Sequence, residues 1–325
     1  MQSQTMKIKL FDELTRSFKV VKAFENDDRI TAIDFSPDGE QLMSCSADDT
    51  ISIYNCELGI QTALLNSKKY GVDLIRFTDE GCTAIHSSTK IDDKIRYLNV
   101  NNNKYFHYFA GHAKKVISLS VSPSNNNFIS TSLDKTLRMW DLRLKDYQNI
   151  LHITGRPIAA YDPDGIVFAV GVNSGSGCIK LYDTRMFDKG PFSTFKMSGE
   201  KECDWISLKF SNDGKTILIS TDGSSSLLID AFFGTHLQTL TGYANNEGIP
   251  IESSFSPDSQ YVFAGSSDGR VHVWNAASGY KVCVLNSGHP SPVQCVQFNP
   301  KYVMLSSACS DVAFWLPTVI DIDEI

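Results

Sequence analysis

A short polar turn that follows an aromatic or apolar residue recurs seven times along the 325 residues of this chain. The copies read "FSPDGE", "FTDEGC", "VSPSNN", "YDPDGI", "FSNDGK", "FSPDSQ" and "FNPKYV". Successive copies begin 42, 44, 40, 49, 45 and 43 residues apart, at Phe35, Phe77, Val121, Tyr161, Phe210, Phe255 and Phe298. A fixed period of this length is typical of a chain built from equivalent small units that stack against one another. The repeat therefore predicts seven copies of one supersecondary unit.

A second signal follows each turn by about twenty residues: an alternating apolar strand that ends in a large residue, usually followed by Asp or Asn. The large residues are Tyr54, Leu98, Trp140, Tyr182, Ile229, Trp274 and Trp315. Runs rich in Val, Ile, Leu, Phe and Tyr alternate with turns rich in Ser, Asn, Asp, Pro and Gly, which favours strands over helices. The period and the Trp-Asp pattern resemble the WD40 repeat, whose unit is a four-stranded blade. The resemblance implies an all-β, seven-bladed WD40 β-propeller.

The outermost strand of the last blade is missing from the sequence after Trp315, whereas the six preceding blades each have one. The stretch "SFKVVKAF", residues 17–24, stands ahead of the first blade without inner strands of its own. We therefore expect the N-terminal strand to complete the last blade, because an unpaired strand edge invites aggregation. The predicted single domain spans residues 1–325, with residues 17–24 as the outer strand of blade 7, residues 27–317 as blades 1 to 7, and residues 318–325 as an acidic tail.

Composition excludes several classes of function. The formal net charge of −7 argues against a protein that wraps nucleic acid. The eight cysteines and seven histidines show no Cys-x-x-Cys or His-x-x-x-His spacing, so neither a metal nor a cofactor is expected. The N-terminus lacks the apolar core of a signal peptide and the longest apolar runs are too short to span a bilayer, which favours the cytosol or nucleus over the membrane or a secreted setting.

One stretch has the residue types of a catalytic triad. It contains His112, Ser132, Asp134 and Trp140. In WD40 blades, residues of these types form a hydrogen-bonded structural brace, and the resemblance implies that role here. The nucleophile turn of hydrolases, G-x-S-x-G, is absent around this serine. The Asp48-Asp49 and Asp92-Asp93 doublets fall in the same tight turn of successive blades, so we interpret them as turn residues and expect no catalytic site.

Lysines concentrate in the loops expected on one face of blades 2 and 3. This candidate site for phosphopeptide or partner binding consists of Lys68, Lys69, Lys90, Lys94, Lys114, Lys115 and Lys135. Corresponding segments of blades 1 and 6 are acidic or neutral. The site is expected to dock an acidic or phosphorylated peptide, with Tyr70 or His112 available for packing. The alternative is that these lysines only keep the face solvated.

Longer phrases carry a more specific resemblance. "SKKYGVDLIRF", "SLDKTLRMWDLR", "MFDKGPFSTFKM" and "ACSDVAFWLP" closely resemble the WD-repeat subunit of the COMPASS-type histone H3 lysine methyltransferase complex. That family implies a nuclear, non-catalytic adaptor that associates with a SET-domain methyltransferase, with type-1 protein phosphatase assemblies in transcription termination and RNA 3′-end processing, and with the phosphorylated RNA polymerase II C-terminal domain. Two alternatives stay open: a substrate receptor of a cullin-type ubiquitin ligase and a propeller hydrolase.

Overall fold

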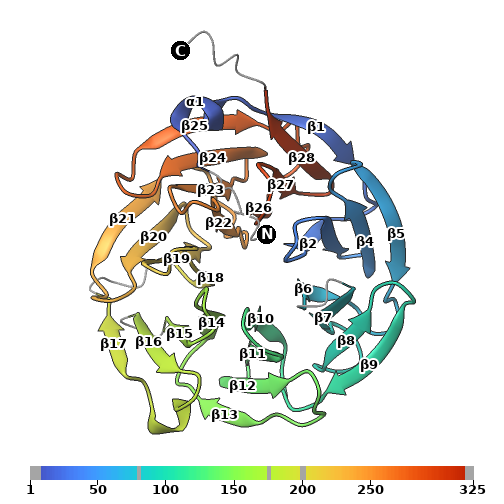
Figure 1. Ribbon diagram of the computed structural model, residues 1–325, viewed down its shortest axis with the longest axis vertical. Coiled ribbons are helices and arrows are strands. Elements are labelled where there is room, and N and C mark those ends of the chain that lie inside the picture. Colours follow the sequence, from blue (N-terminus) through green and yellow to red (C-terminus); the bar gives the residue numbers. More distant parts are fainter. Residues whose placement is uncertain (1–8, 79–81, 174–176, 198–202, 319–325) are drawn as a thin grey trace, which may run out of the picture.

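The computed structural model describes residues 9–78, 82–173, 177–197 and 203–318. Its strands form seven sheets of four antiparallel strands, and Figure 1 shows these sheets arranged radially as the blades of a ring. The predicted fold class, a seven-bladed β-propeller, is confirmed. Residues 319–325 of the predicted acidic tail lie outside the described residues. Within the described residues, no helix is long and apolar enough to cross a membrane.

Blades 1 to 3 each use four consecutive strands, from the innermost to the outermost. Blade 1 consists of β2 (Ile30–Phe35), β3 (Gln41–Ser46), β4 (Thr50–Asn55) and β5 (Ile60–Asn66). Blade 2 consists of β6 (Asp73–Phe77), β7 (Thr83–Ser87), β8 (Ile95–Asn99) and β9 (Lys104–Phe109). Blade 3 consists of β10 (Val116–Val121), β11 (Asn127–Ser132), β12 (Thr136–Asp141) and β13 (Asn149–His152).

Blades 4 to 6 repeat this order. Blade 4 consists of β14 (Pro157–Tyr161), β15 (Val167–Val172), β16 (Cys178–Asp183) and β17 (Ser193–Lys196), with the short 3₁₀ helix η1 (Phe187–Lys189) before β17. Blade 5 consists of β18 (Trp205–Phe210), β19 (Thr216–Thr221), β20 (Ser225–Asp230) and β21 (His236–Thr241). Blade 6 consists of β22 (Ser253–Phe255), β23 (Tyr261–Gly265), β24 (Arg270–Asn275) and β25 (Lys281–Asn286).

Blade 7 joins the two ends of the chain. It combines β26 (Cys295–Phe298), β27 (Leu305–Ala308) and β28 (Val312–Pro317) with β1 (Phe18–Phe24). Strand β1 runs antiparallel to β28 from the pair Phe18 and Pro317 to the pair Phe24 and Val312. The expectation that an N-terminal strand completes the last blade is therefore confirmed, and the edge of β28 is covered (Figure 1).

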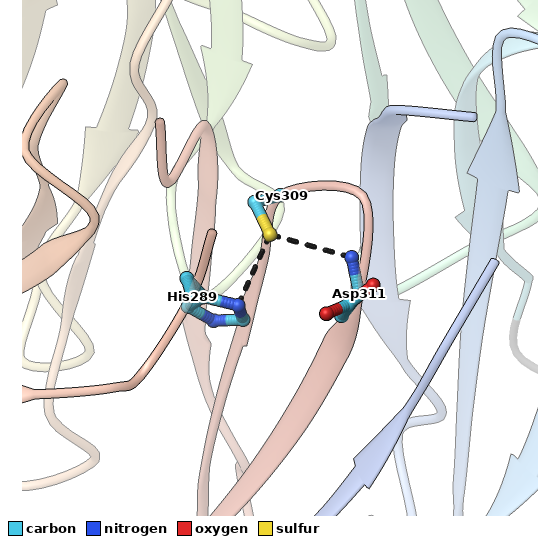
Figure 2. Close-up of side chains that lie close together, drawn as sticks. All are labelled: His289, Cys309 and Asp311. Carbon is cyan, nitrogen blue, oxygen red and sulfur yellow. Dashed lines mark hydrogen bonds between the residues drawn. The ribbon is translucent and has the colours of Figure 1, made fainter. Parts of the chain in front are cut away.

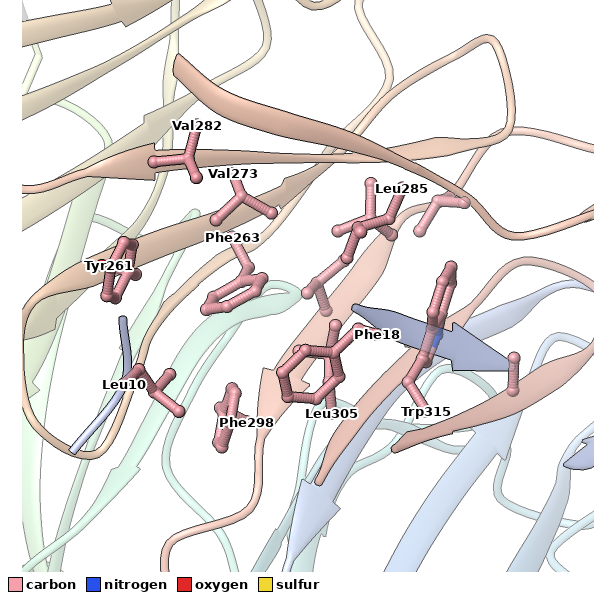
Figure 3. Packing of buried hydrophobic residues seen from close by; sticks show 14 residues of the cluster. Leu10, Phe18, Tyr261, Phe263, Val273, Val282, Leu285, Phe298, Leu305 and Trp315 are labelled. Carbon is pink, nitrogen blue, oxygen red and sulfur yellow. The ribbon is translucent and has the colours of Figure 1, made fainter. Parts of the chain in front are cut away.

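A short helix, α1 (Asp12–Arg16), precedes β1 and was not predicted from the sequence. It lies beside β25 of blade 6 (Figure 1). Leu10, just ahead of the helix, and Phe18 pack into a core cluster between blades 6 and 7 that also contains Phe263, Phe298 and Trp315 (Figure 3). The Phe18 ring meets the Phe298 ring edge-on at 5.8 Å. The chain thus buries apolar residues ahead of β1 as well as within it.

The repeated polar turn has the same two hydrogen bonds in blades 1, 5 and 6, whose copies share Ser at the second position and Asp at the fourth. In blade 5 the Ser211 hydroxyl donates to Asp213 Oδ1 over 2.6 Å, and the N–H of Lys215 donates to the same carboxylate over 3.1 Å. Blade 6 repeats these two bonds at Asp258, from Ser256 at 2.6 Å and from Gln260 at 3.1 Å. The aspartate therefore satisfies local donors of the turn, as Asp side chains commonly do.

Candidate functional site

The lysine-bearing segments gather on one face of blades 2 and 3. We call residues 67–73, 88–94, 110–115 and 132–136 the blade 2–3 face. The N–H groups of Thr89 and Lys90 donate to the carbonyl of Tyr70, over 3.1 and 2.9 Å, which joins the first two segments. The N–H of Leu133 donates to the carbonyl of Lys115 over 3.0 Å, which joins the last two. These contacts bring together segments that are far apart in the sequence.

Three of the predicted lysines lie within ion-pair distance of carboxylates of the same region. Lys90 forms an ion pair with Asp49 of blade 1, and Lys94 Nζ lies 3.5 Å from Asp92. Lys115 Nζ lies 3.1 Å from Asp73, which connects blade 3 to blade 2. Four lysines are exposed and form no ion pair with any residue that the structure describes: Lys68, Lys69, Lys114 and Lys135. The blade 2–3 face is therefore less basic than its lysines alone suggest.

A buried guanidinium that the sequence analysis did not single out lies beneath these lysines. The Arg96 guanidinium carbon lies 3.8 Å from the centre of the Tyr70 ring and 5.3 Å from that of Tyr108. Two of its nitrogens donate to the Asp92 carboxylate over 2.9 and 3.2 Å. Lys69 Nζ lies 5.0 Å from the centre of the Tyr70 ring on the same stack. The Tyr70 ring thus lies close to two cations and attracts both.

Alignment of the repeats was the signal that could have revealed this residue. Arg96 and Arg138 both stand two places before the large residue of their blades, Leu98 and Trp140. Arg138 is also buried and stacks on an aromatic ring, 4.3 Å from the centre of Tyr147. A cation at this place of the repeat therefore packs over a tyrosine in both blades.

The predicted brace of blade 3 is present, but its serine is Ser130 and not Ser132. His112 Nε2 lies 2.7 Å from Ser130 Oγ, to which the Trp140 indole N–H donates over 2.8 Å. His112 Nδ1 lies 3.0 Å from Asp134. Ser132 instead donates to the carbonyl of Lys114 over 2.7 Å. The two serines lie two residues apart on β11 and share a face of the strand, and only Ser130 is level with the Trp140 indole.

The brace has the connectivity of a Ser-His-Asp triad, and its environment decides its role. Asp134 only accepts hydrogen bonds, so His112 Nδ1 carries a proton, and Ser130 donates to the unprotonated Nε2. Burial lowers the pKa of His112 and keeps the imidazole neutral. Ser130 is completely buried, with Trp140 against its hydroxyl. A nucleophile needs access to a substrate, so this geometry suits a structural brace.

The side chain of His112 is only 1% exposed. The expectation that it is available to pack against a bound peptide is therefore wrong, because the brace occupies both of its ring nitrogens. Tyr70 is partly exposed, and its ring already lies against Arg96 and Lys69.

Blade 7 contains a second brace with a different third member. His289 Nε2 lies 2.8 Å from Ser307 Oγ, to which the Trp315 indole N–H also donates over 2.8 Å. His289 Nδ1 faces Cys309 Sγ at 3.1 Å. Burial alone would raise the pKa of the Cys309 thiol, but hydrogen bonds from His289 and from the N–H of Asp311 outweigh it and bring the pKa to about 6. A cysteine sulfur thus stands where blade 3 has the Asp134 carboxylate.

The innermost strands surround an axial cavity of about 450 Å³ that is lined by partly buried charged side chains. Glu252, just before β22, accepts from Lys209 of β18 over 3.1 Å and lies 3.6 Å from Arg76 of β6. Burial would raise the pKa of Glu252, but these two cations hold it at about 2. The ion pairs link blades 2, 5 and 6 across the cavity.

Comparisons with known proteins agree with this architecture. The chain is 68% identical over 314 residues to WD repeat-containing protein 82 of Drosophila melanogaster, covering 96% of this chain and 98% of that protein. It is 34% identical to COMPASS component SWD2 of Saccharomyces cerevisiae, covering 92% of this chain and 95% of that protein. It is 31% identical to Set1 complex component swd2 of Schizosaccharomyces pombe, covering 88% and 92%. The chain belongs to this family of WD-repeat proteins.

The family assignment also explains how the repeat relates to the blades. The model of the WD domain, G-beta repeat, matches residues 18–55, 103–141 and 234–275. The first match begins in β1 of blade 7 and ends with β4 of blade 1, so the WD40 unit combines the outer strand of one blade with three strands of the next. This offset is what makes the N-terminal strand complete the last blade in this member of the family.

Proposed function

We propose that the protein is a non-catalytic scaffold subunit of a nuclear Set1/COMPASS-type complex and supports histone H3 lysine methylation by a SET-domain subunit. Similarity to COMPASS component SWD2 and to Set1 complex component swd2 along about nine-tenths of the chain is the observation that carries this proposal. A rigid ring with many exposed loops suits an adaptor, because it presents several surfaces at fixed positions.

Affinity purification of the tagged protein from nuclear extract, with mass spectrometry of the co-eluting proteins, tests this role. Recovery of a SET-domain methyltransferase is expected. A type-1 phosphatase together with 3′-end processing factors would extend the role to transcription termination. Recovery of cullin-type ubiquitin ligase components alone, or of no partner, would overturn the scaffold proposal.

The finer part of the proposal concerns the ligand of the blade 2–3 face, which we take to be the phosphorylated C-terminal domain of RNA polymerase II. Lys68, Lys69, Lys114 and Lys135 are exposed without a carboxylate partner among the described residues, so they can pair with phosphate groups. Lys90, Lys94 and Lys115 are already paired and position the loops. Binding would therefore depend mainly on the four unpaired lysines.

Charge-reversal variants test whether binding of the phosphorylated peptide depends on these four lysines or on the net charge of the protein. The quadruple variant with Glu at Lys68, Lys69, Lys114 and Lys135 is expected to lose at least about tenfold in affinity for a phosphorylated C-terminal domain peptide, measured by fluorescence anisotropy. The matched control reverses four exposed lysines in turns on the opposite face, Lys145, Lys189, Lys215 and Lys301, so that its net charge equals that of the quadruple variant, and it should bind as the wild type does. Equal affinities of the quadruple variant and the wild type would remove this ligand from the proposal.

A further inference from the structure

The braces of blades 3 and 7 are equivalent except for the group that faces the histidine. Asp134 and Cys309 both stand six residues before the tryptophan of their blades, Trp140 and Trp315. The Asp134 carboxylate accepts bonds from Ala113 and from Thr136 in addition to His112, so it is fully occupied. In blade 7 a sulfur takes this place, and a carboxylate that the brace does not use, that of Asp311, stands beside it.

Three different metal-ligating groups thus meet at the turn between β27 and β28. His289 Nδ1, Cys309 Sγ and a carboxylate oxygen of Asp311 all lie within 4.8 Å of one another. Figure 2 shows the His289 ring and the Asp311 backbone N–H directed at the sulfur from two sides. Among the described residues, the Asp311 carboxylate accepts one hydrogen bond, from the Ser310 hydroxyl over 3.3 Å. It is partly exposed and can turn toward the sulfur and the imidazole.

The groups around this cluster hold it in the arrangement that a metal site needs. Ser307 Oγ lies 2.8 Å from His289 Nε2. When Nδ1 binds a metal, the ring proton is on Nε2 and Ser307 accepts it, as partners of a metal-binding histidine characteristically do. The N–H of Asp311 donates to Cys309 Sγ over 3.3 Å. The carbonyl of Cys309 accepts from the N–H of Ile30 in blade 1 over 2.6 Å, so the turn is fixed against the neighbouring blade.

We propose that His289, Cys309 and Asp311 bind a zinc ion through Nδ1, Sγ and a carboxylate oxygen. Zinc bonds of about 2.0 Å to nitrogen and about 2.3 Å to sulfur place these two atoms roughly 3.5 Å apart in a tetrahedral site. The observed 3.1 Å therefore requires only a small outward movement of the ring. Thiolate with imidazole favours zinc over magnesium or calcium, which prefer oxygen ligands. A fourth position stays open for water.

Cobalt substitution tests the site in the full-length, tag-free protein, reduced and freed of metal with a chelator. Cobalt(II) is expected to bind in one equivalent, to give the charge-transfer absorption of a cobalt–thiolate bond and to be displaced by zinc. Cys309→Ser should abolish this absorption. Asp311→Asn should weaken binding by roughly tenfold or more. Cys82→Ser, at an exposed cysteine outside the cluster, is the matched control and should bind cobalt as the wild type does.

Thermal unfolding distinguishes loss of a ligand from loss of the fold. Asp311→Asn leaves the brace atoms in place and should unfold at the wild-type temperature without metal, while saturating zinc should raise the unfolding temperature of the wild type and not that of Cys309→Ser. Absence of saturable cobalt binding by the wild type would mean that the cluster is a structural brace only. Binding that Cys309→Ser leaves unchanged, or that Cys82→Ser abolishes, would also overturn the site.

Discussion

Asp134 and Asp268 occupy the same place in the repeat, six residues before a tryptophan, yet their contacts differ. Asp134 accepts from His112, Thr136 and the N–H of Ala113. Asp268 is 41% exposed, and its nearest histidine nitrogen lies 4.0 Å away. We therefore expect Asp134→Asn to lower the free energy of unfolding by about 1–3 kcal/mol. Asp268→Asn is the matched control and should cost less than about 0.5 kcal/mol. Urea unfolding measures both, and equal losses would contradict the brace.

Glu252 gives the residue-scale prediction with a pH dependence. Glu252→Gln leaves Arg76 and Lys209 without their shared carboxylate, so it should cost about 2 kcal/mol at neutral pH. The folded pKa of about 2 lies below the ordinary 4.5, so this stabilisation is present above pH 4.5 and is lost as the pH falls toward 2. Urea unfolding at several pH values should show the wild type and the variant converging only in acid. If the difference in the free energy of unfolding between the wild type and the variant persists unchanged toward pH 2, the cost of Glu252→Gln comes from packing and not from the ion pairs.

At the residue scale, the sequence predicted which kinds of interaction form, such as the brace and the basic loops, better than it predicted which residues pair with each other. Ser130 and Ser132 are two residues apart and therefore lie on the same face of β11. The pattern "STSLD" is thus compatible with either serine as the member of the brace. The lysine pairs with Asp49 and Asp73 join different blades, and residues about forty apart come together only after the ring has closed. The brace that contains Cys309 was not predicted from the sequence, because Cys309 replaces the Asp that recurs at this position of the repeat.

At the scale of elements, α1 and Leu10, two residues ahead of it, anchor β1 to blade 6. The N–H of Leu10 donates to Asp258 over 2.7 Å, and the Tyr261 hydroxyl donates to Asp12 over 2.7 Å. Removal of residues 1–16 should lower the free energy of unfolding by about 2–4 kcal/mol, from the lost burial of Leu10 and these bonds. The protein should stay monomeric, because β1 remains. Urea unfolding and light scattering measure the two effects. An associating truncation would contradict this division of roles.

Strands were predictable here and the helix was not, for a physical reason. Each strand has an alternating apolar pattern, and the same order of strands and turns recurs seven times. The alternation, which is weak evidence in any single strand, is therefore supported by the repeat. Helix α1 has five residues, which is too short for a 3.6-residue period to appear, and it depends on contacts with blade 6. Its single occurrence at the start of the chain also leaves it outside the repeat.

At the scale of the whole molecule, β1 determines whether the ring closes. It supplies the backbone partners of β28 and places Phe18 in the cluster between blades 6 and 7 and Phe24 against Tyr54 of blade 1 and Phe314 of blade 7. Deletion of the residues before Asn26 exposes the β28 edge and these apolar contacts together. We expect the truncated protein to aggregate, as measured by size-exclusion chromatography with light scattering, because an open hydrophobic edge pairs with other chains.

The deletion of residues 1–16 is the control for this experiment, since it shortens the N-terminus without exposing the β28 edge. A peptide of residues 17–25 added during refolding should restore monomers by pairing with β28, whereas a scrambled peptide should not. The rescue matters because aggregation alone also follows from general loss of stability, and only a specific missing strand can be replaced in trans. A monodisperse truncation that unfolds cooperatively would mean that the ring is stable with six complete blades and one blade of three strands.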